Sequence, residues 1–170
     1  MSDLINLVAL FGDGLEVVAD SGSSVYAHDQ IMALELKPGA FTGPEPYEDL
    51  PVGRLAGIFR KCWPIQPAVE QWESPPEPEP MKARPCEECD GTGRLGDRVL
   101  CQQCHGSGTE MYAPDQRVCG WLVAGKYVHI IAALPNAQVA QGRHEAIAIR
   151  FDDGRGVVMR IRDREQGATP

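Results

Sequence analysis

Two short repeats, Cys86-Glu87-Glu88-Cys89-Asp90-Gly91-Thr92-Gly93 and Cys101-Gln102-Gln103-Cys104-His105-Gly106-Ser107-Gly108, decide how the centre of this chain folds. Each repeat has the pattern C-x-x-C-x-G-x-G, and eleven residues separate the two cysteine pairs. A C-x-x-C turn brings two thiols to one side of the chain, so two such turns supply four thiolates for a tetrahedral metal site. Because four thiolates leave no open coordination position, we expect one structural zinc ion bound by Cys86, Cys89, Cys101 and Cys104.

Other interpretations of the cysteine pairs stay open. Thiolates also bind iron, so a rubredoxin-type iron site is an alternative to zinc. A dithiol redox pair is a further alternative, which two matched pairs disfavour. His105 follows Cys104 directly, and because four cysteines complete the preferred shell, we expect the imidazole to point to solvent. Positive φ at the glycines of the turns would let the chain fold back under the metal; these are Gly91, Gly93, Gly106 and Gly108.

The pattern of residues 86–108 resembles the cysteine-rich zinc domain of DnaJ-type co-chaperones. That family carries four such repeats and two zinc ions, whereas this chain has two repeats, which are enough for one site. The sequence has no His-Pro-Asp signature of a J-domain, so the resemblance does not imply recruitment of a chaperone ATPase. It does imply a zinc hairpin that grips an extended segment of a partner protein.

A proline-rich stretch precedes the first repeat and marks the zinc hairpin as an insertion. Residues 74–85 contain five prolines, which cannot continue a helix or a strand. Such a stretch favours the extended polyproline II conformation of a semi-rigid spacer. An SH3-type ligand is the alternative, but the acidic flanks disfavour it. We therefore expect a stalk over 74–85 that carries a zinc-binding hairpin over 86–108.

The sequence on either side of this insertion predicts strands and two amphipathic helices. Strands are expected over residues 4–11, 15–19, 25–36, 118–122, 137–140, 145–151 and 156–161. The apolar stripe Val52, Leu55, Ala56, Phe59 and Cys62 predicts a helix that Pro51 opens and Trp63-Pro64 ends. A second apolar stripe predicts a helix over 124–134, and Asp152-Asp153-Gly154-Arg155 is typical of a hairpin turn.

Two helices on a mostly antiparallel sheet predict an α+β fold. We expect residues 1–73 and 110–162 to form one body, and residues 163–170 to form a flexible tail. The remaining cysteines, Cys62 and Cys119, lie among apolar neighbours and are expected to be small core residues.

Several segments of this body are similar to a domain of the bacterial β sliding clamp. Residues 126–134, 146–150 and 153–162 look like the end of such a domain, whereas 11–20 and 26–29 are similar to an early clamp hairpin. A clamp chain has three such domains and closes as a dimer around six, and this chain has material for one. The resemblance therefore implies a single clamp-like domain, and a ring would need several copies of the chain.

In clamps the helices line the central hole and carry basic residues toward DNA. By this resemblance the candidate DNA-facing residues are Arg54, Arg60, Lys61 and Lys126, all on the expected helices. The alternative is that these side chains only keep a helix surface solvated.

Composition excludes several function classes. The 170 residues are 43% hydrophobic and 24% charged with a net charge of −8, which excludes a disordered polar chain and a generally basic nucleic-acid coat. No apolar run reaches membrane-spanning length, and Met1-Ser2-Asp3-Leu4 lacks a basic signal region, so we expect a cytoplasmic protein with reduced thiols. No phosphate loop, G-x-S-x-G elbow or H-E-x-x-H motif is present, so we expect no enzyme activity.

Two hypotheses about function follow. The first is a non-catalytic, zinc-binding, clamp-like accessory in DNA replication or metabolism, with weak DNA binding and assembly into a homo-oligomer. The second is a protein-interaction adaptor whose zinc hairpin holds a partner segment.

Overall fold

Strands from both halves of the chain meet in one six-stranded antiparallel sheet. The computed structural model describes residues 5–6, 9, 11, 16–19, 25–29, 31–37, 39–42, 52–63, 71–96 and 99–161. The strand order is β12-β13-β14-β4-β3-β2. Their bounds are β2 (Glu16–Ala19), β3 (Val25–His28), β4 (Met32–Leu36), β12 (Gln138–Gln141), β13 (Ala146–Phe151) and β14 (Gly154–Met159). The two halves join where β14 pairs with β4, with Val157 opposite Ala33. The α+β class with mostly antiparallel strands is confirmed.

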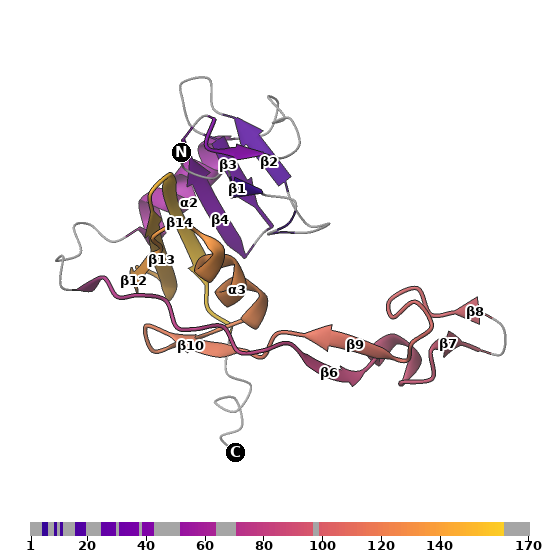
Figure 1. The fold of residues 1–170 in the computed structure, drawn as a ribbon. Coiled ribbons are helices and arrows are strands. Elements are labelled where there is room, and N and C mark those ends of the chain that lie inside the picture. Colours follow the sequence, from indigo (N-terminus) through magenta and orange to yellow (C-terminus); the bar gives the residue numbers. More distant parts are fainter. Residues whose placement is uncertain are drawn as a thin grey trace, which may run out of the picture.

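The two helices cover opposite faces of this sheet. Helix α2 (Val52–Cys62) packs Leu55 and Phe59 against a cluster that contains Ala33. Helix α3 (Gly125–Ala133) packs against a larger cluster that contains Met32 and Leu34, the strand neighbours of Ala33. Because successive side chains of a strand point to opposite faces, the helices lie on different sides of the sheet. In Figure 1, α2 lies behind the sheet strands and α3 lies in front of them.

The hairpin of β13 and β14, the last two strands of the chain, agrees with the prediction. β13 and β14 are joined at Asp152 and Asp153, and Phe151 pairs with Gly154. The strands predicted near 137–161 and the two predicted helices start and end within two residues of the observed ones.

The prediction of one strand over residues 25–36 was wrong, because a turn divides it into β3 and β4. Asp29 makes this turn: its Oδ1 accepts the backbone N–H groups of Ile31 at 3.3 Å and Met32 at 3.1 Å. A carboxylate that accepts local N–H groups in this way stabilises a turn. The divided segment then pairs with itself, with His28 opposite Ala33.

Two further predicted strands differ in the structure. The segment 118–122 belongs to a hairpin of β10 (Gln116–Val118) and β11 (Trp121–Val123), which pair antiparallel. Its turn residues Cys119 and Gly120 have φ of 48° and 83°, and positive φ at both positions is typical of a type I′ turn. Cysteine is an unusual residue at such a position, so the sequence did not indicate the turn.

At the N-terminal end, β1 (Ile5–Asn6) is much shorter than the strand predicted over residues 4–11. It pairs in parallel with β5 (Phe41–Thr42). The Oδ1 atom of Asn6 accepts the N–H of Ala9 at 3.0 Å, and Ala9 and Phe11 are helical. An asparagine that accepts the N–H three residues later is a typical helix cap, so the strand ends there.

No helix in the described part of the chain has the length and apolar character that a membrane crossing requires.

Candidate metal centre at the end of a projecting arm

A two-stranded ribbon carries the cysteine repeats away from the body (Figure 1). It consists of β6 (Lys82–Pro85) and β9 (Thr109–Tyr112), which pair antiparallel. The prediction that residues 74–85 contain no strand was therefore wrong for the last four of them. The Cys86 N–H donates to the Gly108 carbonyl at 2.9 Å, so alternation along the ladder turns the backbone of Pro85 outward. A proline is tolerated there because its missing N–H has no partner in the ribbon.

The stalk before the ribbon lies along the body. Glu73 exchanges two backbone hydrogen bonds with Val139 of β12, at 3.0 and 2.8 Å. The side-chain amide of Gln116 donates to the Glu77 carbonyl at 2.9 Å, and its oxygen accepts the Glu79 N–H at 2.9 Å. The segment before the ribbon is thus anchored to β10 and β12. Residues 81–113, which follow it and carry the two repeats, are called the arm below.

The two cysteine repeats fold in the same way, fifteen residues apart. The Gly91 N–H donates to the Cys86 carbonyl at 3.0 Å, and the Gly106 N–H donates to the Cys101 carbonyl at 3.2 Å. The first repeat includes the short helix η3 (Glu87–Cys89), and β7 (Arg94–Leu95) and β8 (Val99–Leu100) connect the repeats. Because equivalent residues make equivalent bonds, the two repeats form two turns of the same shape. We call them the knuckles, residues 86–93 and residues 101–108.

Hydroxyl side chains brace both knuckles. Thr92 Oγ1 donates to the Cys89 carbonyl at 2.6 Å, and Ser107 Oγ donates to the Cys104 carbonyl at 2.7 Å. Sequence reasoning missed these two residues. The available signal was a hydroxyl residue at the same place between the glycines of both repeats.

The four turn glycines have the positive φ that the sequence predicted. Their φ values are 78° at Gly91, 76° at Gly93, 83° at Gly106 and 73° at Gly108. Two of them also permit close contact between the knuckles. A Cβ at Gly93 would lie 2.4 Å from the Gly106 carbonyl oxygen, and a Cβ at Gly108 would lie 2.3 Å from the Gly91 carbonyl oxygen. The knuckles therefore touch backbone to backbone.

The four thiols form one buried cluster. The Sγ atoms of Cys86 and Cys101 lie 3.7 Å apart, those of Cys89 and Cys104 lie 3.8 Å apart, and all four lie within 4.8 Å of one another. None of the four residues is more than 7% exposed. Four sulfur atoms arranged tetrahedrally at about 2.3 Å from a zinc ion would be about 3.8 Å apart. The donor set and its spacing are therefore compatible with a structural metal ion such as zinc.

Backbone N–H groups point at two of the sulfur atoms. The Gly93 N–H donates to Cys89 Sγ at 3.2 Å, and the Gly108 N–H donates to Cys104 Sγ at 3.3 Å. Such bonds favour the thiolate, which is the form that binds metal. Burial raises the pKa of Cys104, but the N–H of Gly108 and the neighbouring thiol of Cys101 help to lower it to about 7.

The pKa of Cys101 moves in the other direction. The N–H of Cys104 lowers it, whereas burial, the neighbouring thiols and the carboxylate of Glu88 raise it to about 12. A metal ion must therefore displace a proton from Cys101 at neutral pH.

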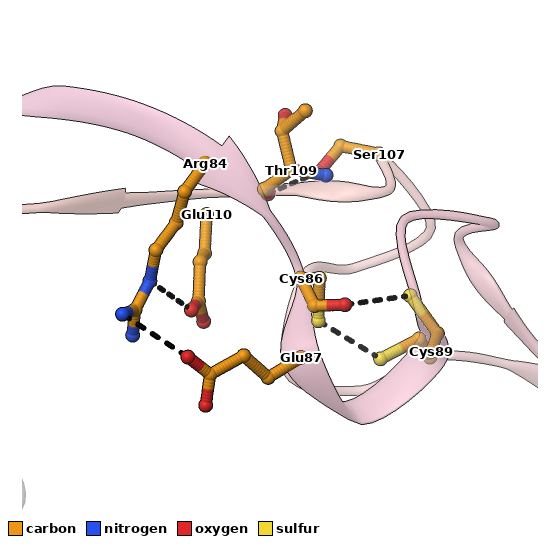
Figure 2. A network of polar contacts seen from close by, with 8 residues as sticks. Arg84, Cys86, Glu87, Cys89, Ser107, Thr109 and Glu110 are labelled. Carbon is orange, nitrogen blue, oxygen red and sulfur yellow. Dashed lines mark hydrogen bonds and ion pairs between the residues drawn. The ribbon is translucent and has the colours of Figure 1, made fainter.

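Charged residues brace the end of the ribbon next to the cluster (Figure 2). The Arg84 Nε lies 2.7 Å from Glu110 Oε1 across the ribbon, and its Nη1 lies 3.2 Å from Glu87 Oε1. The guanidinium also lies over the ring of Tyr112, 5.0 Å from its centroid. Because Arg84 is exposed to solvent, these ion pairs contribute little to stability.

His105 is exposed with φ of 51°, as predicted, and it does not join the thiol cluster. Cys62 is buried in the α2 cluster, as expected. Cys119 is instead a half-buried turn residue, and burial together with the carboxylate of Glu73 raises its pKa to about 12.

The arm also exposes apolar side chains that sequence reasoning did not single out. At its tip, Leu95 is 37% exposed, and Val99 and Leu100 are each 58% exposed. Nearer the body, Met81 is 47% and Met111 is 60% exposed. The sequence could have indicated them, because a short insertion cannot form an apolar core of its own. Large apolar residues within such an insertion are therefore expected to be exposed.

The expected DNA-facing residues do not share one surface among the described side chains. Arg60 and Lys61 are exposed on α2, whereas Lys126 belongs to α3 on the opposite face of the sheet. Lys126 also has a local partner, because its Nζ lies 3.0 Å from Asp29 Oδ2. The fourth candidate, Arg54, has its side chain outside the described part of the structure.

No family model, curated protein or solved structure gives a significant match to this chain. Function must therefore be argued from the residues of the arm and the body themselves.

Proposed function

We propose that this chain is a non-catalytic protein-interaction adaptor. One zinc ion, bound by Cys86, Cys89, Cys101 and Cys104, holds the arm in shape. The arm then grips an extended segment of a partner protein. The observation that carries this proposal is the concentration of exposed large apolar side chains on the arm.

Seven large apolar residues are exposed in the described part of the chain, and five of them belong to the arm. The five are Met81, Leu95, Val99, Leu100 and Met111, and the other two are Ile31 and Ile58 on the body. At the tip, Leu95 pairs with Val99, and Leu100 follows Val99 in the chain. Exposed apolar side chains gathered in this way are typical of a site that contacts another protein. Because the arm is also the smaller part of the described residues, exposed large apolar side chains are concentrated on it.

The proposed role of zinc follows from what the arm lacks. Among its described residues the arm has one buried cluster, which consists of the four cysteines alone. A module without an apolar core of its own derives its folding free energy from metal binding. Zinc would thus decide whether the apolar side chains at the tip have fixed positions.

The DNA-replication hypothesis receives no comparable support. Arg60 and Lys61 are separated from Lys126 by the sheet, so the helices offer no joint basic surface among the described side chains. A ring built on this body would need to bind DNA without that surface.

The test uses reduced, carboxymethylated α-lactalbumin, an acidic chain that stays unfolded, labelled with a fluorophore. We expect its fluorescence anisotropy to rise with the zinc-loaded full chain and to rise far less after zinc removal. Val99→Ser combined with Leu100→Ser should weaken binding at least tenfold. Ile31→Ser combined with Ile58→Ser is the matched control on the body and should leave binding unchanged. Equal binding by the arm variant and the control would overturn the proposal.

A further inference from the structure

A cavity of about 620 Å³ lies where the arm meets the body. Its apolar lining comes from both parts. The arm supplies Met81, Met111 and Ala113, and the body supplies Ala9, Ala124 and Ile130. This volume is in the range of pockets that enclose a ligand or a large side chain.

The two faces of the ribbon differ in chemistry. Lys82 pairs with Tyr112 and Arg84 pairs with Glu110, so these four side chains share one face, on which Arg84 contacts both Glu110 and Tyr112. Ala83 pairs with Met111, so the opposite face carries small and apolar side chains. The cavity is lined by Met111 of this face and by its neighbour Tyr112, and it extends from the ribbon to α3.

The two edges of the ribbon also differ. The bond from Cys86 to Gly108 sets the alternation, so the backbones of Ala83 and Pro85 point outward on β6 and that of Met111 points outward on β9. Pro85 has no N–H to offer, which interrupts strand pairing along the β6 edge.

The β9 edge has no such interruption beside the cavity. Among the described residues, no group accepts the Met111 N–H or donates to its carbonyl beyond the ribbon. Backbone groups of this kind are the usual attachment points for an added strand.

Ionisable side chains also line the cavity. They are Lys126, His129, Asp115 and Tyr112, and Lys126 is already paired with Asp29, whose Oδ2 lies 3.0 Å from its Nζ. His129 Nε2 lies 3.0 Å from the Glu79 carbonyl oxygen, which holds the ring at the root of the stalk. The kind of partner that fits here therefore follows from the open strand edge and the apolar lining, and not from charge.

We infer that an extended partner segment with a large apolar side chain adds a strand to the outer edge of β9. Its backbone pairs with the N–H and carbonyl of Met111, and the apolar side chain enters the cavity. This inference rests on the proposed adaptor function and names the place and manner of binding.

Two proline variants test which edge of the ribbon is used. Met111→Pro removes the outward N–H of β9, and Ala83→Pro removes the matching N–H of β6, with neither touching a ladder bond. With carboxymethylated α-lactalbumin as the probe, we expect Met111→Pro to weaken binding at least tenfold and Ala83→Pro to change it less than twofold. Equal effects of the two variants would overturn the inference, provided that both variants retain the metal content of the wild type.

Two further measurements do not depend on a proline. Ala124→Phe fills the cavity from the side of α3 and should also weaken binding at least tenfold. In the wild-type chain, the bound probe should slow amide hydrogen exchange of Met111 and leave that of Ala83 unchanged. Unchanged exchange at Met111 under saturating probe contradicts strand addition.

The results separate this inference from the function on which it rests. Loss of binding in the Val99 and Leu100 variant but not in Met111→Pro or Ala124→Phe would keep the adaptor function and reject the β9 site. If the zinc-loaded wild type does not bind the probe, both are rejected.

Discussion

The Sγ atom of Cys86 lies 3.7 Å from that of Cys101, although the two residues belong to different knuckles. Cys89 and Cys104 have the same relationship, at 3.8 Å and again fifteen residues apart. The backbone bonds cross between the knuckles as well, because the Cys86 N–H donates to Gly108 and the Cys101 N–H donates to Gly93. The thiols are therefore brought together by reciprocal contacts between two equivalent turns.

These contacts predict a difference between two glycines of the arm. Gly93→Ala should displace the Gly106 backbone, since its Cβ would lie 2.4 Å from the Gly106 oxygen. Gly96→Ala is the matched control, because Gly96 also has positive φ, 68°, but no atom within 4 Å of the added Cβ. We expect Gly93→Ala to weaken zinc affinity at least tenfold in competition with a chromophoric chelator. Gly96→Ala should cost only about 1 kcal/mol of local stability, and equal affinities would contradict the account of the knuckles.

Replacing one ligand should unfold the arm and spare the body. Cys89→Ser removes a thiolate from the only buried cluster found among the described residues of the arm. We expect this variant to lose the metal and the dispersed NMR signals of residues 86–108, while the signals of the sheet persist. Cys119→Ser is the control, because Cys119 lies in the β10–β11 turn and should keep one metal ion per chain. Retention of the metal by Cys89→Ser is the contrary result.

The clustering of Cys86, Cys89, Cys101 and Cys104 could be predicted, because the spacing of two C-x-x-C pairs brings four thiols together. The hairpin at Asp152 and Asp153 was predictable for a similar reason, since its turn chemistry is local. The turn at Asp29 was missed because residues 25–36 contain no glycine or proline to mark it, although Asp29 Oδ1 accepts the local N–H groups. The bonds of its Oδ2 to Lys126 and Tyr127 span about a hundred residues and could not be predicted. The sequence also could not predict which face of the sheet each helix covers. An apolar stripe identifies a helix but not the side of the sheet on which it packs.

Removal of residues 83–111, most of the arm, should leave a folded body. Lys82 and Tyr112 are paired across the base of the ribbon, so a short Gly/Ser linker can replace residues 83–111 without moving the ends. The body then keeps its six-stranded sheet and the stalk contacts of Gln116. We expect one cooperative thermal transition, with a midpoint near that of the full chain. A molten or insoluble product would mean that the arm belongs to the same folding unit.

Asp29 should make the stability of the body depend on pH. Its Oδ2 accepts bonds from Lys126 Nζ at 3.0 Å and Tyr127 Oη at 2.9 Å, so it ties the β3–β4 turn to α3. Burial opposes ionisation, but the Met32 N–H, Lys126 and Tyr127 outweigh it and lower the pKa of Asp29 below 3.8. A lowered carboxyl pKa contributes stability above the unfolded pKa, and that contribution is lost as the pH falls through the folded pKa.

Two variants of Asp29 test this link by chemical denaturation. Asp29→Ala should lower the free energy of unfolding by about 1–3 kcal/mol at neutral pH, because it leaves several donors without their acceptor. Asp29→Asn should lose less stability than the wild type between about pH 5 and about pH 3. Parallel pH profiles for Asp29→Asn and the wild type would show that this carboxylate does not link the turn to the helix.

The most direct test of the central claim is the metal content of the freshly purified, reduced chain. Inductively coupled plasma mass spectrometry gives the zinc and iron concentrations, which are divided by the protein concentration. A site in which Cys86, Cys89, Cys101 and Cys104 hold one structural zinc ion predicts one zinc per chain in the wild type and none in Cys89→Ser. One iron per chain would keep the four-thiolate site and change its metal. The absence of both metals from the wild-type chain would contradict the account of the arm.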